Sequence, residues 1–199
     1  PCCRSILPTP PYLRPALSAT GTRPAPPRRF AGPGPCYALH GAPAGGGLFR
    51  RREFLQLGGF DPLYHPFYWE DIDLGWAAWR AGWRIVYDTR ARFIHRESAT
   101  IGRLYHPGYV ARVRARNRCL FGWKNFHTPW LRRRHNLGLV RRAVVGLLRR
   151  RDPAPLLGLL DAVRMRRRAM EARPQTPGAR SDVEILAQFA ISLDEFLRI

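Results

Sequence analysis

Apolar residues recur every three to four positions in several stretches of the chain, and this spacing predicts amphipathic helices. The longest predicted helix spans residues 107–126, and the apolar stripe along it consists of Val110, Val113, Asn117, Leu120 and Phe121. Shorter helices are predicted over 48–57, with Phe49, Phe54 and Leu57 facing inward, and over 71–81. Each is followed by glycine, which ends a helix readily because it adopts the left-handed backbone conformation.

Alternation of apolar and polar residues predicts short strands between these helices. Residues 83–87 alternate and are rich in strand-forming residues, and residues 91–95 form a similar segment that ends at His95. Residues 36–40 predict a strand that enters a glycine-rich loop at 45–47, where a backbone can approach a ligand closely. A generic flexible turn explains this loop equally well, and a lone histidine at a strand end is most often structural.

The two ends of the chain differ in composition from its middle. Residues 1–35 are rich in proline, glycine, alanine and arginine, which predicts irregular structure because proline removes backbone donors and blocks helices. Residues 128–199 alternate apolar stretches with arginine triplets, which predicts a basic helical extension. Within it, residues 172–180 predict a linker, and residues 181–184 predict a capping box that opens a last short helix.

The charge balance indicates an anionic partner. The chain has 34 Lys and Arg against 14 Asp and Glu, which gives a net charge of +20. Lys124 is its only lysine, and because GC-rich genomes favour arginine, the basic charge is a weaker signal of a partner than its size suggests. Basic amphipathic helices suit an anionic membrane surface. Nucleic acid would use the same charges, but it ranks below the membrane because the chain has no RRM or KH signature and no basic stripe with interleaved aromatic residues.

Two further absences bear on where the protein works. No uninterrupted apolar run approaches the ~20 residues that a membrane span requires. The four cysteines show no C-x-x-C pair and no zinc-ligand spacing, which favours a reduced, cytosolic chain.

The most unusual stretch of the sequence is 58–74, which places Glu70, Asp71 and Asp73 in an aromatic, proline-containing segment. Crowded carboxylates repel one another, and burial raises their pKa, so such a cluster needs a cation or a task to hold it. A helix N-terminus explains the cluster as well, because acids there meet the positive end of the helix dipole. The two interpretations do not exclude each other.

Four motifs occur in order around these acids: F-R-R at 49–51, L-G-G-F-D at 57–61, W-E-D-x-D-L at 69–74 and R-x-G-W at 80–83. Together with His95 they closely resemble the second half of bacterial family 2 glycosyltransferases, a family that includes rhamnosyl- and galactofuranosyl-transferases. The resemblance covers about residues 36–127. It implies an α/β fold, the C-terminal part of a Rossmann-like GT-A domain, and an inverting transfer of sugar from a nucleotide donor.

The resemblance also implies roles for individual residues. Asp71 would be the general base that takes the proton of the acceptor hydroxyl, with Glu70 beside it shaping the site. His95 would be a ligand of a divalent metal, Mn²⁺ or Mg²⁺, that neutralises the departing diphosphate. Gly45, Gly46 and Gly47 would match the family's glycine-containing loop at the sugar and acceptor side, and Trp69 would face acceptor or sugar. Arg96 and Arg103 lie near His95 in sequence, and we hypothesise from this that they contact the diphosphate.

One departure from the family limits this expectation. The family binds its nucleotide through an N-terminal half that ends in Asp-x-Asp, and no such motif occurs before residue 61. We therefore expect three parts: an irregular segment at 1–35, the acceptor side of a catalytic domain at 36–127 and the basic extension at 128–199. Such a fragment would bind a nucleotide-sugar poorly by itself.

The resemblance further implies an acceptor on a cell-surface glycan or a lipid-linked sugar, with the enzyme peripheral on the inner face of the bacterial plasma membrane. Two rival hypotheses remain at this point. One is a non-catalytic basic module that binds membrane or nucleic acid, and the other is a glycosyltransferase remnant that has lost activity.

Overall fold

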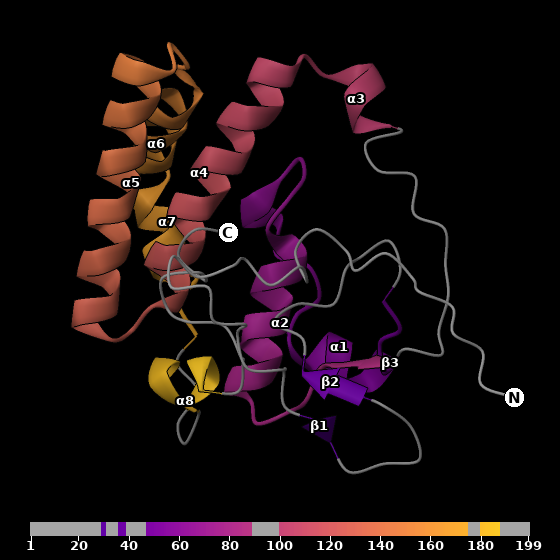
Figure 1. The fold of residues 1–199 in the computed structure, drawn as a ribbon. Helices are drawn as coiled ribbons and strands as arrows, with labels where there is room; N and C mark the ends of the chain where they lie inside the picture. The colour runs from indigo at the N-terminus through magenta and orange to yellow at the C-terminus, as the bar shows by residue number, and fades with distance from the viewer. Residues whose placement is uncertain (1–28, 31–35, 39–46, 89–99, 175–179, 188–199) are drawn as a thin grey trace, which may run out of the picture.

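The computed structural model describes residues 29–30, 36–38, 47–88, 100–174 and 180–187, and most of them lie in helices (Figure 1). The helices are α1 (Arg51–Gln56), the 3-10 helix η1 (Pro62–Tyr64), α2 (Glu70–Arg80), α3 (Ile101–Leu104), α4 (Pro107–Asn125), α5 (Pro129–Arg149), α6 (Ala154–Arg164), α7 (Arg166–Glu171) and α8 (Asp182–Leu186). The strands are β1 (Arg29–Phe30), β2 (Cys36–Ala38) and β3 (Val86–Asp88).

The predicted α/β, Rossmann-like fold is wrong for the part of the chain that the structure describes. The three strands form one small antiparallel sheet in the order β1-β2-β3, with Tyr37 opposite both Arg29 and Tyr87. A Rossmann-like domain instead needs parallel strands covered by helices. Strands of two or three residues cannot bury a core, and the described core lies between helices. The segment 83–87 becomes a strand only from Val86 onward, and 91–95 lies outside the described residues.

Glycines end the first two helices as the sequence predicts. After α2, Gly82 has φ 86°, its N–H donates to Trp79 O (3.0 Å), and the next N–H, of Trp83, donates to Ala78 O (3.0 Å). This pair of hydrogen bonds is a Schellman motif, which satisfies carbonyls at the helix end. The same pattern follows α1 at Gly58 and Gly59. The ends of both helices are therefore fixed by local chemistry.

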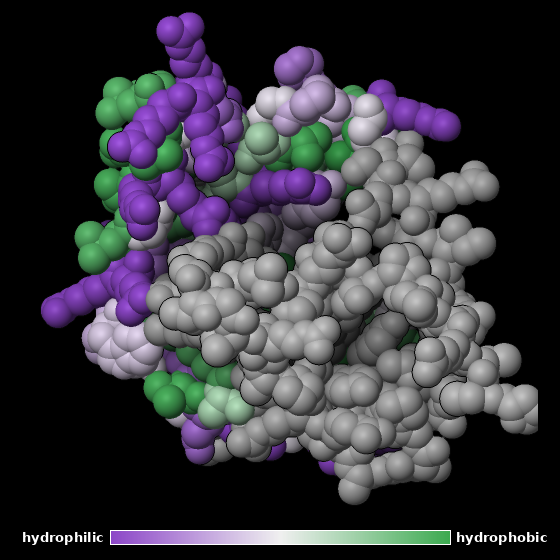
Figure 2. Space-filling model, in the orientation of Figure 1, coloured by the Kyte–Doolittle hydropathy of each residue, from purple (hydrophilic) through white to green (hydrophobic). Residues whose placement is uncertain are grey.

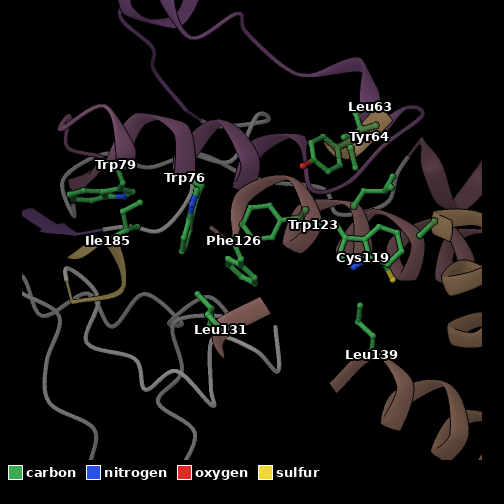
Figure 3. Close-up of a cluster of buried hydrophobic side chains, with 14 residues drawn as sticks. Leu63, Tyr64, Trp76, Trp79, Cys119, Trp123, Phe126, Leu131, Leu139 and Ile185 are labelled. Atoms are coloured by element: carbon green, nitrogen blue, oxygen red, sulfur yellow. The ribbon is translucent and has the colours of Figure 1, made fainter. Parts of the chain in front are cut away.

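The core forms where α2, α4 and α5 meet, and helix α8 closes one end of it (Figure 3). The rings of Trp76 and Trp79 are buried on the inner face of α2. Trp76 packs edge-on against Phe121 of α4 and against Phe126 just beyond α4, with ring centroids 5.7 and 5.5 Å apart. Both tryptophans are core residues.

The basic extension packs against the rest of the molecule. Asp182, at the start of α8, is buried and accepts a hydrogen bond from Arg80 of α2 at 2.6 Å. Its other oxygen accepts from the backbone N–H groups of His127 and Thr128, which connect α4 to α5. The predicted capping box of α8 is confirmed, because Ser181 and Glu184 bond each other's backbone N–H groups.

Helix α6 lies directly against α4, at a distance that leaves no room for a side chain at Gly158. A methyl group there would lie 2.6 Å from both Ala115 Cβ and Arg112 O. The same contact is bridged by Arg112, whose guanidinium donates to both oxygens of Asp161 at 2.5 and 2.7 Å. Within the described residues, none of these helices combines the length and apolar character needed to cross a membrane.

The close approach of α4 and α6 predicts opposite effects at two helical glycines. Gly158→Ala should lower the free energy of unfolding by about 1–3 kcal/mol, because the added methyl overpacks the contact. Gly138→Ala in α5 is the matched control, because a methyl there meets nothing within 4 Å. It should be neutral or stabilising by about 0.5–1 kcal/mol. Urea unfolding followed by circular dichroism measures both, and equal stability of the two variants would contradict this packing.

Candidate functional site

The candidate site lies at the N-terminal end of α2, immediately after a sharp turn at Tyr68 and Trp69. Both residues have positive φ, 68° and 79°, in a region that costs a non-glycine residue about 1–3 kcal/mol. Asn117 of α4 offsets this cost. Its buried side-chain nitrogen lies 2.7–2.9 Å from the carbonyl oxygens of Tyr64, Phe67 and Tyr68. Helix α4 thus fixes the turn from which the first residues of α2 emerge.

Side chains of α4 also cover this turn. The guanidinium of Arg114 lies 4.0 Å from the centroid of the Tyr68 ring, and that of Arg118 lies 5.3 Å from Trp69. Phe121 packs on Trp69 at 5.3 Å between centroids. Burial lowers the pKa of Arg118 to about 10, and its Nη2 has no hydrogen-bond partner among the described residues. Trp69, expected to face acceptor or sugar, therefore has its ring in contact with α4.

Asp73 is buried and accepts three hydrogen bonds. Its Oδ1 accepts hydrogen bonds from the Tyr64 hydroxyl at 2.7 Å and from the Asn125 amide at 2.6 Å. Its Oδ2 accepts from Lys124 Nζ at 2.6 Å, and the same ammonium lies 2.7 Å from Asp61 Oδ2. A compact ammonium suits a position between two carboxylates. Three donors therefore occupy three of the roughly four lone-pair sites of the Asp73 carboxylate, which holds α2 against α4.

This network changes the ionisation of two of its members. Burial, and then the charge of Asp73, raise the pKa of the Tyr64 hydroxyl well above its ordinary value, so Tyr64 stays a neutral donor. Burial acts to lower the pKa of Lys124, but the charges and hydrogen bonds of Asp73 and Asp61 outweigh it, and the pKa is raised. Both groups therefore hold their protons more tightly in the folded protein than in the unfolded chain.

Glu70 and Asp71 share the first turn of α2 with Asp73 but lack its partners. Both are partly buried, and no cation lies within ion-pair distance of either among the described residues. Asp71 Oδ1 accepts from the backbone N–H of Ile72 at 2.8 Å, whereas Glu70 Oε2 is buried without a hydrogen-bond partner in the described part of the chain. Burial raises the pKa of both carboxyls, and the charge of Asp71 contributes further to the shift of Glu70.

A carboxylate in this state is suited to accepting a proton. A raised pKa brings it closer to the pH at which a general base works best. The positive end of the α2 dipole favours the ionised form and thus limits the shift. Among the described residues, the structure therefore divides the three acids into one that is paired with a cation, Asp73, and two that are not, Glu70 and Asp71.

The remaining predicted site residues are only partly described. Gly47 is partly exposed shortly before α1. Arg103 is exposed in α3, and Tyr105 just after α3 packs on Phe67 at 5.0 Å, which brings α3 toward the turn before α2. Four predicted residues lie outside the described part of the chain: Gly45, Gly46, His95 and Arg96.

The expected metal site is likewise not covered. Within the described ranges, no group of three His, Cys, Asp or Glu side chains could hold a metal ion. His95, the expected ligand, is not among them. The metal therefore stays a prediction.

The network around Asp73 was not predicted from the sequence. The sequence indicates only a helix N-terminus at Glu70, Asp71 and Asp73, and it predicts no role for Tyr64 or Asn125. One signal could have revealed it: Lys124 is the only lysine among 34 basic residues. A lysine kept where the composition so strongly favours arginine indicates a position that requires a compact ammonium.

Comparison with known proteins supports a glycosyltransferase in general. The chain is 45% identical over 56 residues to N-acetylglucosaminyl-diphospho-decaprenol L-rhamnosyltransferase from two Mycobacterium tuberculosis strains, CDC 1551 / Oshkosh and ATCC 25618 / H37Rv. The match covers 28% of this chain and 18% of each relative. No family model matches the chain, and no solved structure matches it.

The raised pKa values of Tyr64 and Lys124 predict a loss of stability at alkaline pH. Both groups bind protons more tightly when folded, so their contribution is complete below their unfolded pKa values, 10.0 and 10.5, and declines as the pH rises above them. Urea unfolding from neutral pH upward should show this decline. Tyr64→Phe should be less stable at neutral pH but show a shallower alkaline decline, because phenylalanine does not titrate. An unchanged slope in this variant would contradict the assignment.

Proposed function

We propose that this protein is an inverting glycosyltransferase that transfers a sugar from a nucleoside diphosphate donor to a hydroxyl of a lipid-linked or cell-surface glycan. The observation that carries the proposal is the state of Asp71: a partly buried carboxylate at a helix N-terminus, with a raised pKa and no cation within ion-pair distance among the residues that the structure describes. The 56-residue match to a rhamnosyltransferase supports the choice of reaction.

In the proposed reaction Asp71 acts as the general base. The acceptor oxygen attacks the anomeric carbon of the donor sugar while its proton passes to the Asp71 carboxylate. The bond between the anomeric carbon and the diphosphate oxygen breaks, and the nucleoside diphosphate leaves with that electron pair. Attack opposite to the leaving group inverts the anomeric centre. Proton transfer to a positioned group of this kind contributes about 10²–10⁴-fold in rate.

The neighbouring residues would position Asp71 and the substrates. Glu70 shares its turn, and its raised pKa lets it carry a proton at a higher pH than an ordinary glutamate, which would reduce repulsion between the two acids. Trp69 would shape the approach to this turn. Arg103 would contact the donor diphosphate, and a divalent metal, with His95 among its ligands, would neutralise the developing charge when bound.

The name of the M. tuberculosis relative suggests an acceptor class. That protein is named for transfer of L-rhamnose to N-acetylglucosaminyl-diphospho-decaprenol. We propose for this protein an acceptor of the same chemistry, a sugar linked through diphosphate to a long isoprenoid chain. Such an acceptor would keep the enzyme at a membrane surface.

The base assignment predicts that Asp71→Asn lowers kcat by about 10²–10⁴-fold in the natural protein while leaving its stability nearly unchanged. Turnover is measured as nucleoside diphosphate released, with an activated rhamnose and an N-acetylglucosaminyl-diphospho-isoprenoid acceptor first and a panel of other nucleoside diphosphate sugars next. Near-normal turnover of this variant would contradict the role of Asp71 as the general base. Unchanged turnover after dialysis against EDTA would contradict the proposed role of a divalent metal in the reaction.

Asp73→Asn is the matched comparison, because it makes the same chemical change two residues away in the same helix. It leaves Lys124 with a poorer partner in a buried site, so it should destabilise the protein by several kcal/mol, about 3–5 if the pair is broken outright. Equal losses of stability in Asp71→Asn and Asp73→Asn would contradict the inference that only Asp73 forms a structural ion pair.

A further inference from the structure

Helix α5 presents an apolar stripe to solvent on the side opposite its buried face. Its inner positions, Leu131, Leu139 and Ala143, are buried in the core. A helix turns about 100° per residue, so residues three, four and seven positions apart share a face. On the outer face they leave a stripe of five exposed residues: Trp130 (49% exposed), Leu137 (72%), Val140 (53%), Val144 (48%) and Leu148 (74%).

Arginines accompany this stripe, which we call the α5 stripe. Arg133 and Arg141 are exposed on the same side of α5, and Arg149, Arg150 and Arg151 follow at its C-terminal end. Figure 2 shows the result over α5, at the left of the view: hydrophobic patches alternate with projecting hydrophilic side chains. No acidic residue occurs between Pro129 and Arg151. The surface is therefore both apolar and cationic along its whole length.

We propose that the α5 stripe docks this protein on an anionic phospholipid surface, with the helix lying in the plane of the interface. Leucine, valine and tryptophan side chains would enter the boundary between headgroups and acyl chains, while the flanking guanidinium groups bind lipid phosphates. Arginine suits this arrangement because its stem lies along apolar surface while its head reaches the headgroups. The 21 residues of α5 give a contact about 30 Å long.

Charge selects lipid over the other occupants that an apolar stripe could have. Pairing of two copies through α5 would bring arginine against arginine on a chain with a net charge of +20, and such like-charge contact is costly. Nucleic acid would match the charge, but only Trp130 of the five stripe residues offers a base an aromatic surface, and the four aliphatic residues offer none. An anionic membrane matches both the charge and the apolar residues.

The stripe lies in α5, and the candidate active site lies at the start of α2, on a different element of the fold (Figure 1). This proposal therefore does not depend on the glycosyltransferase proposal, and each can fail while the other stands.

Vesicle co-sedimentation of the full chain tests the proposal, using phosphatidylcholine vesicles with and without phosphatidylglycerol. The wild-type chain should bind the anionic vesicles and should bind more weakly as salt is raised. The triple variant Leu137→Gln, Val144→Gln, Leu148→Gln should bind them about tenfold or more weakly, because it removes the apolar contact and keeps every charge. Glutamine forms helices well, so α5 should persist, which circular dichroism checks.

Two matched controls distinguish binding through the α5 stripe from nonspecific hydrophobic adsorption and from nonspecific electrostatic attraction to the vesicles. Leu55→Gln with Leu104→Gln removes two exposed leucines from α1 and α3, away from α5, and should bind like wild type. Arg133→Gln with Arg141→Gln should weaken binding about tenfold or more, whereas Arg51→Gln with Arg52→Gln removes the same charge from α1 and should change it much less.

Two results would overturn the proposal. One is equal binding of the triple variant and wild type to anionic vesicles. The other is a wild-type dimer in analytical ultracentrifugation that is absent in the triple variant, while the vesicle binding of the variant stays unchanged. This result would show that the stripe binds a second copy of the chain.

Discussion

A single buried ammonium organises the region around the candidate site. Lys124 of α4 lies between Asp73 of α2 and Asp61, which precedes η1, while Tyr64 and Asn125 complete the hydrogen bonds of Asp73. Removing one partner from such a buried pair typically costs about 3–5 kcal/mol, because the remaining charge has no water to solvate it. Lys124 and Asn125 thus hold the first turn of α2 in its position against the C-terminal end of α4.

That position determines what the other two acids can do. The turn at Tyr68 and Trp69 is energetically unfavourable, and Asn117 holds it from the same helix that supplies Lys124. Helix α2 therefore starts at a fixed point, with Asp71 partly buried and no cation within ion-pair distance among the described residues. Asp73, one half-turn further along the same helix, is the carboxylate that pairs with Lys124.

Much of the local structure could be predicted from the sequence. Helices at 71–81 and 107–126, the glycine stops and the capping box at Ser181 depend on contacts within a few residues, and the structure confirms them. The α/β fold failed because it came from a resemblance over the motifs, not from strand patterns long enough to build a parallel sheet. The strands that form are two or three residues long.

The network around Asp73 could not be predicted because it depends on distant residues. Lys124 meets Asp73 and Asp61 across 51 and 63 positions of sequence, and Arg80 meets Asp182 across 102. Helical periodicity places a residue on a face but does not say which charge will lie opposite. The sequence could identify three crowded acids, and only the packing of α4 on α2 distinguishes Asp73 from Asp71.

The pH dependence of kcat/KM tests the role of Asp71 most directly. A general base must be deprotonated to act, and burial raises the pKa of Asp71 above its ordinary value of 3.8. We predict that kcat/KM of the natural protein falls on the acid side with an apparent pKa above 3.8, while circular dichroism shows the fold intact. In Asp71→Asn the residual activity should lose this acid limb. An acid limb that persists unchanged in this variant would contradict the assignment of Asp71 as the base.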